Sequence, residues 1–229
     1  MYNFDGRVEE IQLDHQGFGA ARIICPKDVI PSPGQYVLAH SPHDPDAPLG
    51  KTLFASETSD EGFLSVPPVP RSWEPGTRLL LRGRLGHGFN PPKDTQRLGI
   101  IALDNTLSYL LPLATQGLRV GSSVAIYADG PLPALPSDLE VHPLSAAHEA
   151  ANWADFLGIC LYLESLPGLR DRMQLDPGDQ IACPAQALIL APMPCNGLAE
   201  CGVCGVPARR GWKMTCKDGP VFPLASIEW

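Results

Sequence analysis

Residues 98–106 read Leu-Gly-Ile-Ile-Ala-Leu-Asp-Asn-Thr, and this stretch decides the fold of the second half of the chain. The apolar run Leu98 to Leu103 is typical of a strand, and Asp104-Asn105-Thr106 is typical of a helix start. We expect a helix over Leu107 to Gln116, although Pro112 would break a helix interior and favours a kink or a later start. The stretch therefore predicts a strand followed by a helix.

The alternation of strand and helix continues downstream. The pattern predicts strands at Ser123 to Ala128 and Leu139 to Val141, then a helical stretch around Ala147 to Leu166. After a predicted turn at Pro177-Gly178 the chain is largely apolar to Ala191. Strands that alternate with helices indicate a small parallel α/β domain, which we assign to residues 95–190.

The first ninety residues have a different pattern. Short β-branched or aromatic runs are separated by turns such as Pro31-Ser32-Pro33-Gly34 and Asp44-Pro45-Asp46. The predicted strands are Gly6 to Leu13, Gly19 to Cys25, Gln35 to Ser41, Gly62 to Val66 and Thr77 to Arg82. Many short strands at this spacing favour a barrel or a sandwich over residues 1–94.

Charge and hydropathy exclude two classes of partner. Against 17 Lys and Arg stand 25 Asp and Glu, and the basic residues do not cluster, so we expect no nucleic-acid partner. The longest apolar runs fall well short of the ~20 residues of a membrane helix, so we expect no membrane partner. The first residues lack the features of a signal peptide, and we therefore expect a cytoplasmic location.

Four of the seven cysteines lie within residues 191–229, with the spacing Cys195-x5-Cys201-x2-Cys204-x11-Cys216. Plant-type [2Fe-2S] proteins use C-x4-C-x2-C and a distant fourth cysteine, so this spacing has one extra residue. Glycines lie in or beside the loop, where they permit the backbone to approach the cluster: Gly197, Gly202 and Gly205. We predict a [2Fe-2S] cluster, whose metal would supply the folding energy that this small tail lacks.

Two alternatives to the cluster remain open. A four-cysteine zinc site usually has two C-x2-C pairs, and this chain has one. Free or disulfide-bonded thiols are the other alternative, although an odd cysteine count is unusual for a disulfide framework. We expect Cys25, Cys160 and Cys183 to be small buried hydrophobic residues.

Other candidate residues carry little functional signal. The six histidines are scattered, without acidic or cysteine partners at a metal-site spacing, and we expect surface or core positions for all of them: His15, His40, His43, His87, His142 and His148. No G-x-S-x-G or H-E-x-x-H motif is present. Trp212 and Phe222 flank the fourth cysteine of the loop as exposed aromatic candidates, which would shield the cluster, face a partner or pack locally.

Three motifs carry a resemblance to a known family. Cys216-Lys217-Asp218-Gly219-Pro220-Val221-Phe222 resembles the end of the cluster segment in the iron-sulfur electron-transfer subunit of dihydroorotate dehydrogenase. Pro33-Gly34-Gln35-Tyr36-Val37 is similar to the P-G-Q-F/Y-V strand of the ferredoxin-reductase flavin barrel. Gly83-Arg84-Leu85-Gly86-His87-Gly88-Phe89 is similar to the family's G-P-L-G-N-G-F. The resemblance implies an FAD-type β-barrel over residues 1–94, an NAD-type α/β domain over 95–190 and a [2Fe-2S] module over 191–229.

The chain departs from that family at both nucleotide sites. The family's flavin motif R-P-x-S would fall at Lys51-Thr52-Leu53-Phe54, where Lys51 keeps a charge without the fork of arginine and Phe54 lacks the serine hydroxyl. These four residues are the candidate FAD site, and the substitutions weigh slightly against FAD. The turn Leu103-Asp104-Asn105-Thr106 places bulk and a carboxylate where glycine and phosphate belong, which argues against NAD.

The leading hypothesis is an electron-transfer subunit rather than a stand-alone catalyst. By resemblance it would exchange electrons with a flavin-containing catalytic subunit of the dihydroorotate dehydrogenase type, in a hetero-oligomer of pyrimidine biosynthesis. A second hypothesis is a reductase that holds FAD and uses the cluster as a relay. The third is a zinc-stabilised adaptor without a redox role. The dihydroorotate assignment rests on resemblance alone, because a fold does not determine a substrate.

Overall fold

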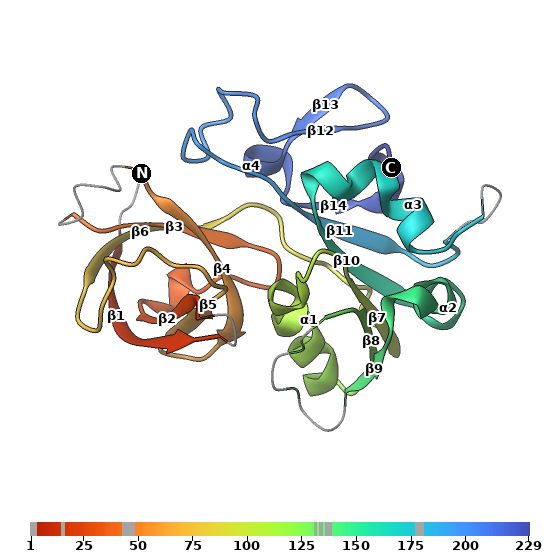
Figure 1. Cartoon of the computed structure of the whole chain (residues 1–229), viewed down its shortest axis with the longest axis horizontal. Helices are drawn as coiled ribbons and strands as arrows, with labels where there is room; N and C mark the ends of the chain where they lie inside the picture. The colour runs from red at the N-terminus through yellow and green to blue at the C-terminus, as the bar shows by residue number, and fades with distance from the viewer. Residues whose placement is uncertain are drawn as a thin grey trace.

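The computed structural model describes residues 4–14, 17–42, 49–130, 132, 135, 139–176 and 181–229. Two bodies lie side by side in Figure 1, a barrel drawn in red to yellow and a twisted sheet with helices drawn in green to blue. The sequence-predicted turns at Asp44-Pro45-Asp46 and Pro177-Gly178 lie outside the described residues, as do His15 and His43.

The N-terminal body is a closed six-stranded barrel. Its strands follow the order β1-β2-β5-β4-β3-β6, and every described pairing in it is antiparallel. They are β1 (Phe4–Leu13), β2 (Gly19–Ile24), β3 (Tyr36–His40), β4 (Lys51–Thr58), β5 (Gly62–Ser65) and β6 (Arg78–Leu85), with a short 3-10 turn at Lys27–Val29. The inward-facing apolar side chains fill the barrel, as the period of two along a strand requires.

The barrel confirms the first part of the predicted fold. Five of its strands match predicted strands, with ends that differ by up to three residues. The remaining strand, β4, was not predicted as a strand. It lies between β3 and β5 in the barrel, which closes through the pairing of β1 with β6.

The second body is a six-stranded sheet of order β14-β11-β10-β7-β8-β9. The strands β7 (Arg97–Ala102), β8 (Ser123–Ala128), β9 (Glu140–His142), β10 (Phe156–Tyr162) and β11 (Ala185–Leu190) run parallel, and β14 (Val221–Pro223) joins the edge antiparallel. This order reverses between β7 and β10, so the carboxyl ends of these two strands flank the crevice where open α/β sheets bind ligands.

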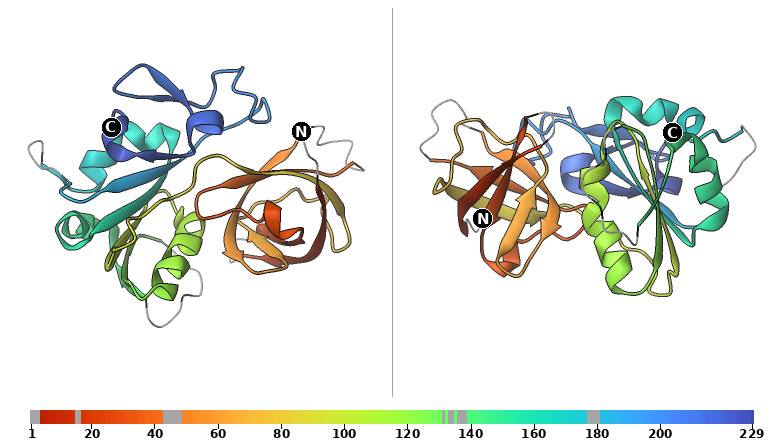
Figure 2. Two further views of the ribbon diagram at one scale, coloured as in Figure 1. Left: turned by 180° about the vertical axis from the view of Figure 1, so that it is seen from behind. Right: turned by 60° about the horizontal axis from the view of Figure 1, so that its bottom comes forward.

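Helices cover both faces of this sheet. Helix α1 (Leu107–Arg119) packs between the sheet and the barrel, and α2 (Ala147–Trp153) and α3 (Leu169–Arg172) pack on the far face (Figure 2). Short 3-10 turns at Leu144–Ala146 and Leu163–Gly168 precede α2 and α3. Alternate residues of β7 divide between the two apolar clusters, because successive side chains of a strand point to opposite faces.

The helix predicted from Leu107 is confirmed, whereas another prediction in this domain was wrong. Helix α1 starts at Leu107 and runs through Pro112 to Arg119, so the proline neither ends the helix nor delays its start. The predicted helical stretch Ala147 to Leu166 contains strand β10 in the middle of the sheet. Six of the seven β10 residues are buried, and a strand buried on both faces has the same continuous apolar pattern as a buried helix.

Residues 191–229 form a small extension that returns to the sheet. A hairpin of β12 (Gly205–Pro207) and β13 (Trp212–Met214) leads into the single turn α4 (Thr215–Asp218), and β14 then pairs with β11. Phe222 on β14 is 3% exposed, so the prediction of an exposed aromatic side chain was wrong there, whereas Trp212 is 69% exposed. No helix in the described part of the chain is both long and apolar enough to cross a membrane.

Candidate iron-sulfur site and the domain cleft

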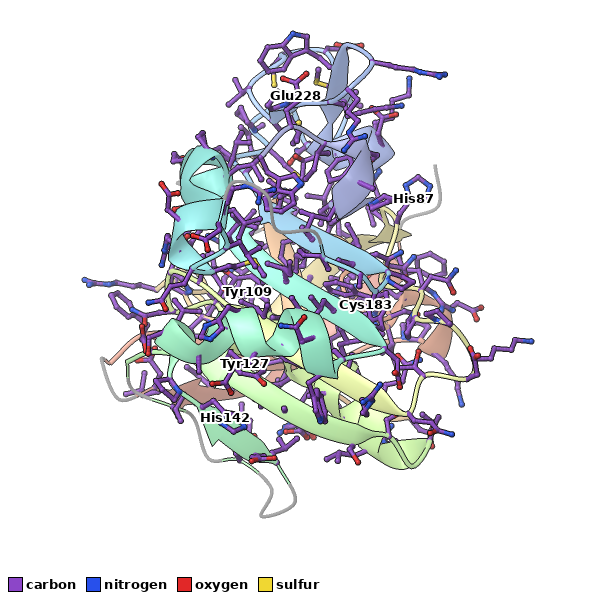
Figure 3. All side chains as sticks on the ribbon, turned by 90° about the vertical axis from the view of Figure 1, so that its right-hand side faces the viewer. His87, Tyr109, Tyr127, His142, Cys183 and Glu228 are labelled. Carbon is purple, nitrogen blue, oxygen red and sulfur yellow. The ribbon has the colours of Figure 1, made fainter. Side chains whose placement is uncertain are left out.

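The four clustered cysteines come from three neighbouring segments. Cys195 and Cys201 lie in the loop after β11, Cys204 directly precedes β12, and Cys216 lies in α4. The pairing of β12 with β13 brings Cys204 close to Cys216, because Gly205 is opposite Met214 in the register. Yellow sulfur atoms are visible in this C-terminal extension at the top of Figure 3.

The thiols gather as two pairs. The Sγ atoms of Cys204 and Cys216 lie 3.4 Å apart, too far for a disulfide bond and close to the separation of about 3.8 Å between two thiolates on one tetrahedral metal ion with metal–sulfur bonds of about 2.3 Å. The Cys201 thiol forms a hydrogen bond to the Cys195 sulfur. The described residues contain no group of three or more His, Cys, Asp or Glu side chains that could hold a single metal ion.

Backbone N–H groups of the loop point at the sulfur atoms. The N–H groups of Leu198, Glu200 and Cys201 donate to the Cys195 sulfur, and that of Ala199 donates to Cys216. Left-handed backbone makes this possible, with φ of 52° at Asn196, 71° at Gly197, 60° at Ala199 and 71° at Gly202. Successive N–H groups in such a loop form an anion-binding concavity, as thiolates and inorganic sulfide require.

The electrostatics differ between the two pairs. Burial alone would raise the pKa of Cys195, but the backbone donors and the Cys201 thiol outweigh it and lower the pKa to about 6. Burial and the neighbouring Cys204 raise the pKa of Cys216 to about 12. Cys204 and Cys216 are buried, Cys195 is partly buried and Cys201 is exposed, so one end of the group faces solvent.

Two side chains of the barrel form hydrogen bonds to the backbone of the cysteine segment. The Tyr36 hydroxyl on β3 donates to the carbonyl oxygen of Cys216 at 2.9 Å, and Arg82 Nη1 on β6 donates to the carbonyl oxygen of Asn196 at 3.0 Å. A Cβ on Gly197 would lie 3.1 Å from the Tyr36 hydroxyl oxygen, so this glycine permits the close approach. Burial raises the pKa of Tyr36 to about 12, so the hydroxyl remains a donor at neutral pH.

The segment between barrel and sheet also contacts the extension. The His87 N–H donates to the Gly219 carbonyl oxygen at 2.6 Å, and His87 Nδ1 lies 3.1 Å from the Asp218 carbonyl oxygen. His87 is labelled beside the extension in Figure 3. Two of the motifs that carry the resemblance, Gly83 to Phe89 and Cys216 to Phe222, are therefore in contact.

The candidate FAD residues lie on β4 as the strand alternation dictates. Lys51 is exposed, Thr52 is partly buried, and Leu53 points into the barrel core. The Phe54 ring packs outward against Tyr36, with ring centroids 5.9 Å apart, and against Tyr109 of α1, with centroids 5.4 Å apart. Side chains thus fill the space beside Phe54, the position at which the resemblance places the hydroxyl next to a flavin ring.

The turn after β7 keeps left-handed backbone without glycine. Asp104 and Asn105 have φ of 56° and 59°, which Asp and Asn adopt more readily than most residues. The Asp104 carboxylate pairs with Arg172 of α3 and accepts from the Tyr162 N–H at 3.2 Å. Burial opposes ionisation, but these partners lower the pKa of Asp104. A carboxylate of the chain therefore occupies the crevice between β7 and β10.

A cleft of about 700 Å³ lies between the barrel and the carboxyl ends of β7 and β8. Aromatic side chains from both bodies line it, among them Phe18, Tyr109 and Tyr162. Its charged lining residues are all acidic: Asp14, Glu57, Asp104 and Asp129. The described lining contains no Lys or Arg, the side chains that bind phosphate groups.

The three cysteines outside the cluster loop differ in burial. Cys25 and Cys160 are buried, as predicted, and Cys183 is partly buried. The contributions of Tyr36, Arg82 and His87 were missed by the sequence analysis. Spacing offered no signal for them, since a contact between residue 36 and residue 216 is not encoded by a local pattern.

No family model matches the chain, and no curated protein sequence matches it. Solved structures do match. An NADH-dependent reduced ferredoxin-NADP oxidoreductase, studied for flavin-based electron bifurcation, is 14% identical, with a TM-score of 0.68 over 98% of this chain and 90% of its own.

Two further structures have the same architecture. A ferredoxin reductase of carbazole 1,9a-dioxygenase is 15% identical, with a TM-score of 0.58 over 77% of this chain and 65% of its own. The FAD/NAD-binding domain of nitric oxide dioxygenase from Vibrio cholerae is 14% identical, with a TM-score of 0.55 over 84% of this chain and 100% of its own. The chain therefore has the ferredoxin-reductase-type fold, a flavin-type barrel joined to a parallel α/β domain.

Proposed function

We propose that the chain is an electron-transfer protein that holds a [2Fe-2S] cluster through Cys195, Cys201, Cys204 and Cys216. The observation that carries the proposal is the arrangement of the thiols as two pairs under a loop of inward-pointing N–H groups. A two-iron cluster with four cysteine ligands takes two thiolates on each iron, so two pairs suit it. A structural zinc ion needs four ligands around one point.

The cluster, when bound, accepts and releases one electron at a time. The residues of the chain determine how readily this happens. The N–H groups of Leu198, Glu200 and Cys201 stabilise negative charge on the Cys195 side, and the Ala199 N–H does so at Cys216. Burial of Cys204 and Cys216 keeps water from the inner side, whereas the exposed Cys201 gives a short path to a partner.

The cluster extension has the composition of a docking surface. Three large apolar side chains are exposed there on the cluster extension: Leu198 at 54%, Val203 at 49% and Trp212 at 69%. Within residues 195–217 the sequence has four basic residues and one acidic residue, in a chain whose net charge is −8. Arg209, Arg210 and Lys213, here called the basic rim, are exposed and close in sequence to Trp212. Exposed apolar and basic side chains suit a partner surface that is apolar and carries carboxylates.

By resemblance, that partner is the flavin-containing catalytic subunit of a dihydroorotate dehydrogenase. The chain would then exchange electrons with the partner's flavin in a hetero-oligomer. The assignment is tested by mixing the purified chain with such a flavoprotein and dihydroorotate under anaerobic conditions. Cluster reduction that requires both the flavoprotein and dihydroorotate would support the assignment. Cluster reduction only with a flavoprotein that oxidises an unrelated substrate would contradict it and assign that flavoprotein as the partner.

Metal, sulfide and flavin analysis of anaerobically purified protein tests the cluster itself. We expect about two irons and two sulfides per chain and an EPR signal after reduction. Cys204→Ser should abolish these signals, while the matched variant Cys183→Ser should retain them, because Cys183 lies outside the cysteine loop. Zinc without sulfide in the wild type would establish the zinc-stabilised adaptor instead.

An FAD-containing reductase is the second candidate, and the cleft of about 700 Å³ favours it. The cleft lies between the two bodies of the chain, whose fold is similar to that of an FAD/NAD-binding domain. Its acidic lining and the ring of Phe54 beside Tyr109 count against a flavin with a pyrophosphate. One flavin per chain in the same analysis would favour the reductase, and a flavin-free protein with a reducible cluster would favour the relay.

A further inference from the structure

Arg82 lies where the barrel meets the cysteine loop. It is on β6, partly buried, and its Nη1 donates to the carbonyl oxygen of Asn196, the residue after Cys195. The Tyr36 hydroxyl of the same barrel donates to the carbonyl oxygen of Cys216, so Arg82 and Tyr36 contact the first and the last part of the cysteine segment. Arg82 is therefore a neighbour of the cluster site through the backbone of the loop.

The charge of Arg82 lacks a carboxylate partner among the described residues. The described ion pairs do not include it, and its Nε is buried without a hydrogen-bond acceptor in that part of the chain. A partly buried cation is costly unless an anion lies near it. The thiols of the loop would supply such an anion once they ligate a cluster, since a [2Fe-2S] centre with four thiolates has a net negative charge in both redox states.

We propose that Arg82 is a positioning residue that provides the counter-charge for the cluster and raises its reduction potential. The inference rests on the proposed function. The hydrogen bond from Arg82 to Asn196 holds the first turn of the loop, and the positive charge of Arg82 favours the reduced cluster. Reduction adds one negative charge to the centre, so a nearby cation stabilises the reduced form more than the oxidised form.

Replacement of Arg82 separates these two contributions. Arg82→Gln removes the charge and keeps a hydrogen-bond donor, and Arg82→Lys keeps the charge on a different donor. Arg78→Gln is the matched control, because Arg78 is on the same strand but its side chain is 73% exposed and paired with Asp5. All three variants and the wild type are first assayed for iron and sulfide, then titrated potentiometrically with EPR detection.

We expect Arg82→Gln to hold the cluster and to be roughly tenfold harder to reduce, a fall of about 59 mV for a one-electron couple. Arg82→Lys and Arg78→Gln should stay close to the wild type. Equal potentials in Arg82→Gln and Arg78→Gln would overturn the inference while leaving the cluster established. If Arg82→Gln fails to retain iron, the potential of Arg82→Lys decides. A potential within a few millivolts of the wild type supports the counter-charge role, and a fall of about 59 mV in this charged variant contradicts it. A wild type without iron and sulfide would overturn the proposed function and this inference together.

Discussion

The Tyr36 hydroxyl donates a 2.9 Å hydrogen bond to the carbonyl oxygen of Cys216, which lies 180 residues further along the chain. One bond thus joins the third strand of the barrel to the helical turn that presents the last candidate ligand. Arg82 makes the equivalent contact to the loop that begins at Cys195. The barrel therefore contacts the cysteine segment next to its first cysteine and at its last cysteine.

Tyr36→Phe should destabilise the protein without opening a cavity. The substitution keeps the ring that packs on Phe54 but leaves the Cys216 carbonyl without its donor, a loss of about 1–2 kcal/mol in the free energy of unfolding. Urea unfolding followed by circular dichroism measures it. Tyr127→Phe is the control, because the Tyr127 ring stacks on His142 and no described partner hydrogen-bonds its hydroxyl. A loss of similar size in both variants would mean that the bond to Cys216 contributes nothing specific.

Phe54→Ala should weaken the contact between the two bodies. The Phe54 ring is 9% exposed and lies between Tyr36 of the barrel and Tyr109 of α1. Removal of a buried phenylalanine ring costs about 3–5 kcal/mol, so we expect a loss in that range by urea unfolding. Phe18→Ala, at a side chain that is 46% exposed, should cost much less. Equal costs would show that the interface can repack around the missing ring.

The main architecture could be predicted from sequence because its signals are local. The short strands of the barrel, the strand and helix on either side of Asp104, and the spacing of the four cysteines each lie within a few residues of one another. The confirmed elements include β8, whose observed ends coincide with the predicted ones. The identity of the ligand that the cysteines hold stays a prediction.

Elements whose burial depends on distant segments were harder to predict. Strand β10 is covered on both faces, so its apolar run Phe156–Tyr162 lacks the alternation that marks a strand. Strand β4 was used only as a motif position, although Leu53 and Phe54 point to different apolar clusters as strand neighbours do. The supporting contacts of Tyr36 and Arg82 with the cysteine loop arise from tertiary packing, and no spacing rule reports them.

The ion pair between Asp104 and Arg172 should make stability depend on acidic pH. The pKa of Asp104 is lowered in the folded protein, so the pair stabilises the fold above the unfolded pKa of about 3.9, and this stability is lost as pH falls through the folded pKa. Asp104→Asn should cost about 1–2 kcal/mol at pH 7 and progressively less below about pH 4. Unfolding free energies of both proteins measured from pH 7 to pH 3 test this. A difference that stays constant over that range would contradict the role of the charge.

The basic rim of the cluster extension should select electron acceptors by charge. Arg209 and Arg210 are exposed at the turn between β12 and β13, close in sequence to the exposed Trp212. We expect the reduced protein to transfer electrons to anionic ferricyanide several-fold more slowly at high salt than at low salt, and to a cationic hexaamminecobalt complex faster at high salt, because salt screens attraction and repulsion alike. Stopped-flow mixing at several salt concentrations measures both rates.

Reversal of charge on this rim provides the control for the salt series. The double variant Arg209→Glu/Arg210→Glu should invert both salt dependences, and the barrel variant Arg78→Glu should leave them as in the wild type, because Arg78 lies on the opposite body. Iron content should not change in either variant, and the unfolding free energy should change by less than about 1 kcal/mol, since all three side chains are exposed. Rates that respond to salt in the same direction for both acceptors would show that electrons leave the protein through a surface other than this rim.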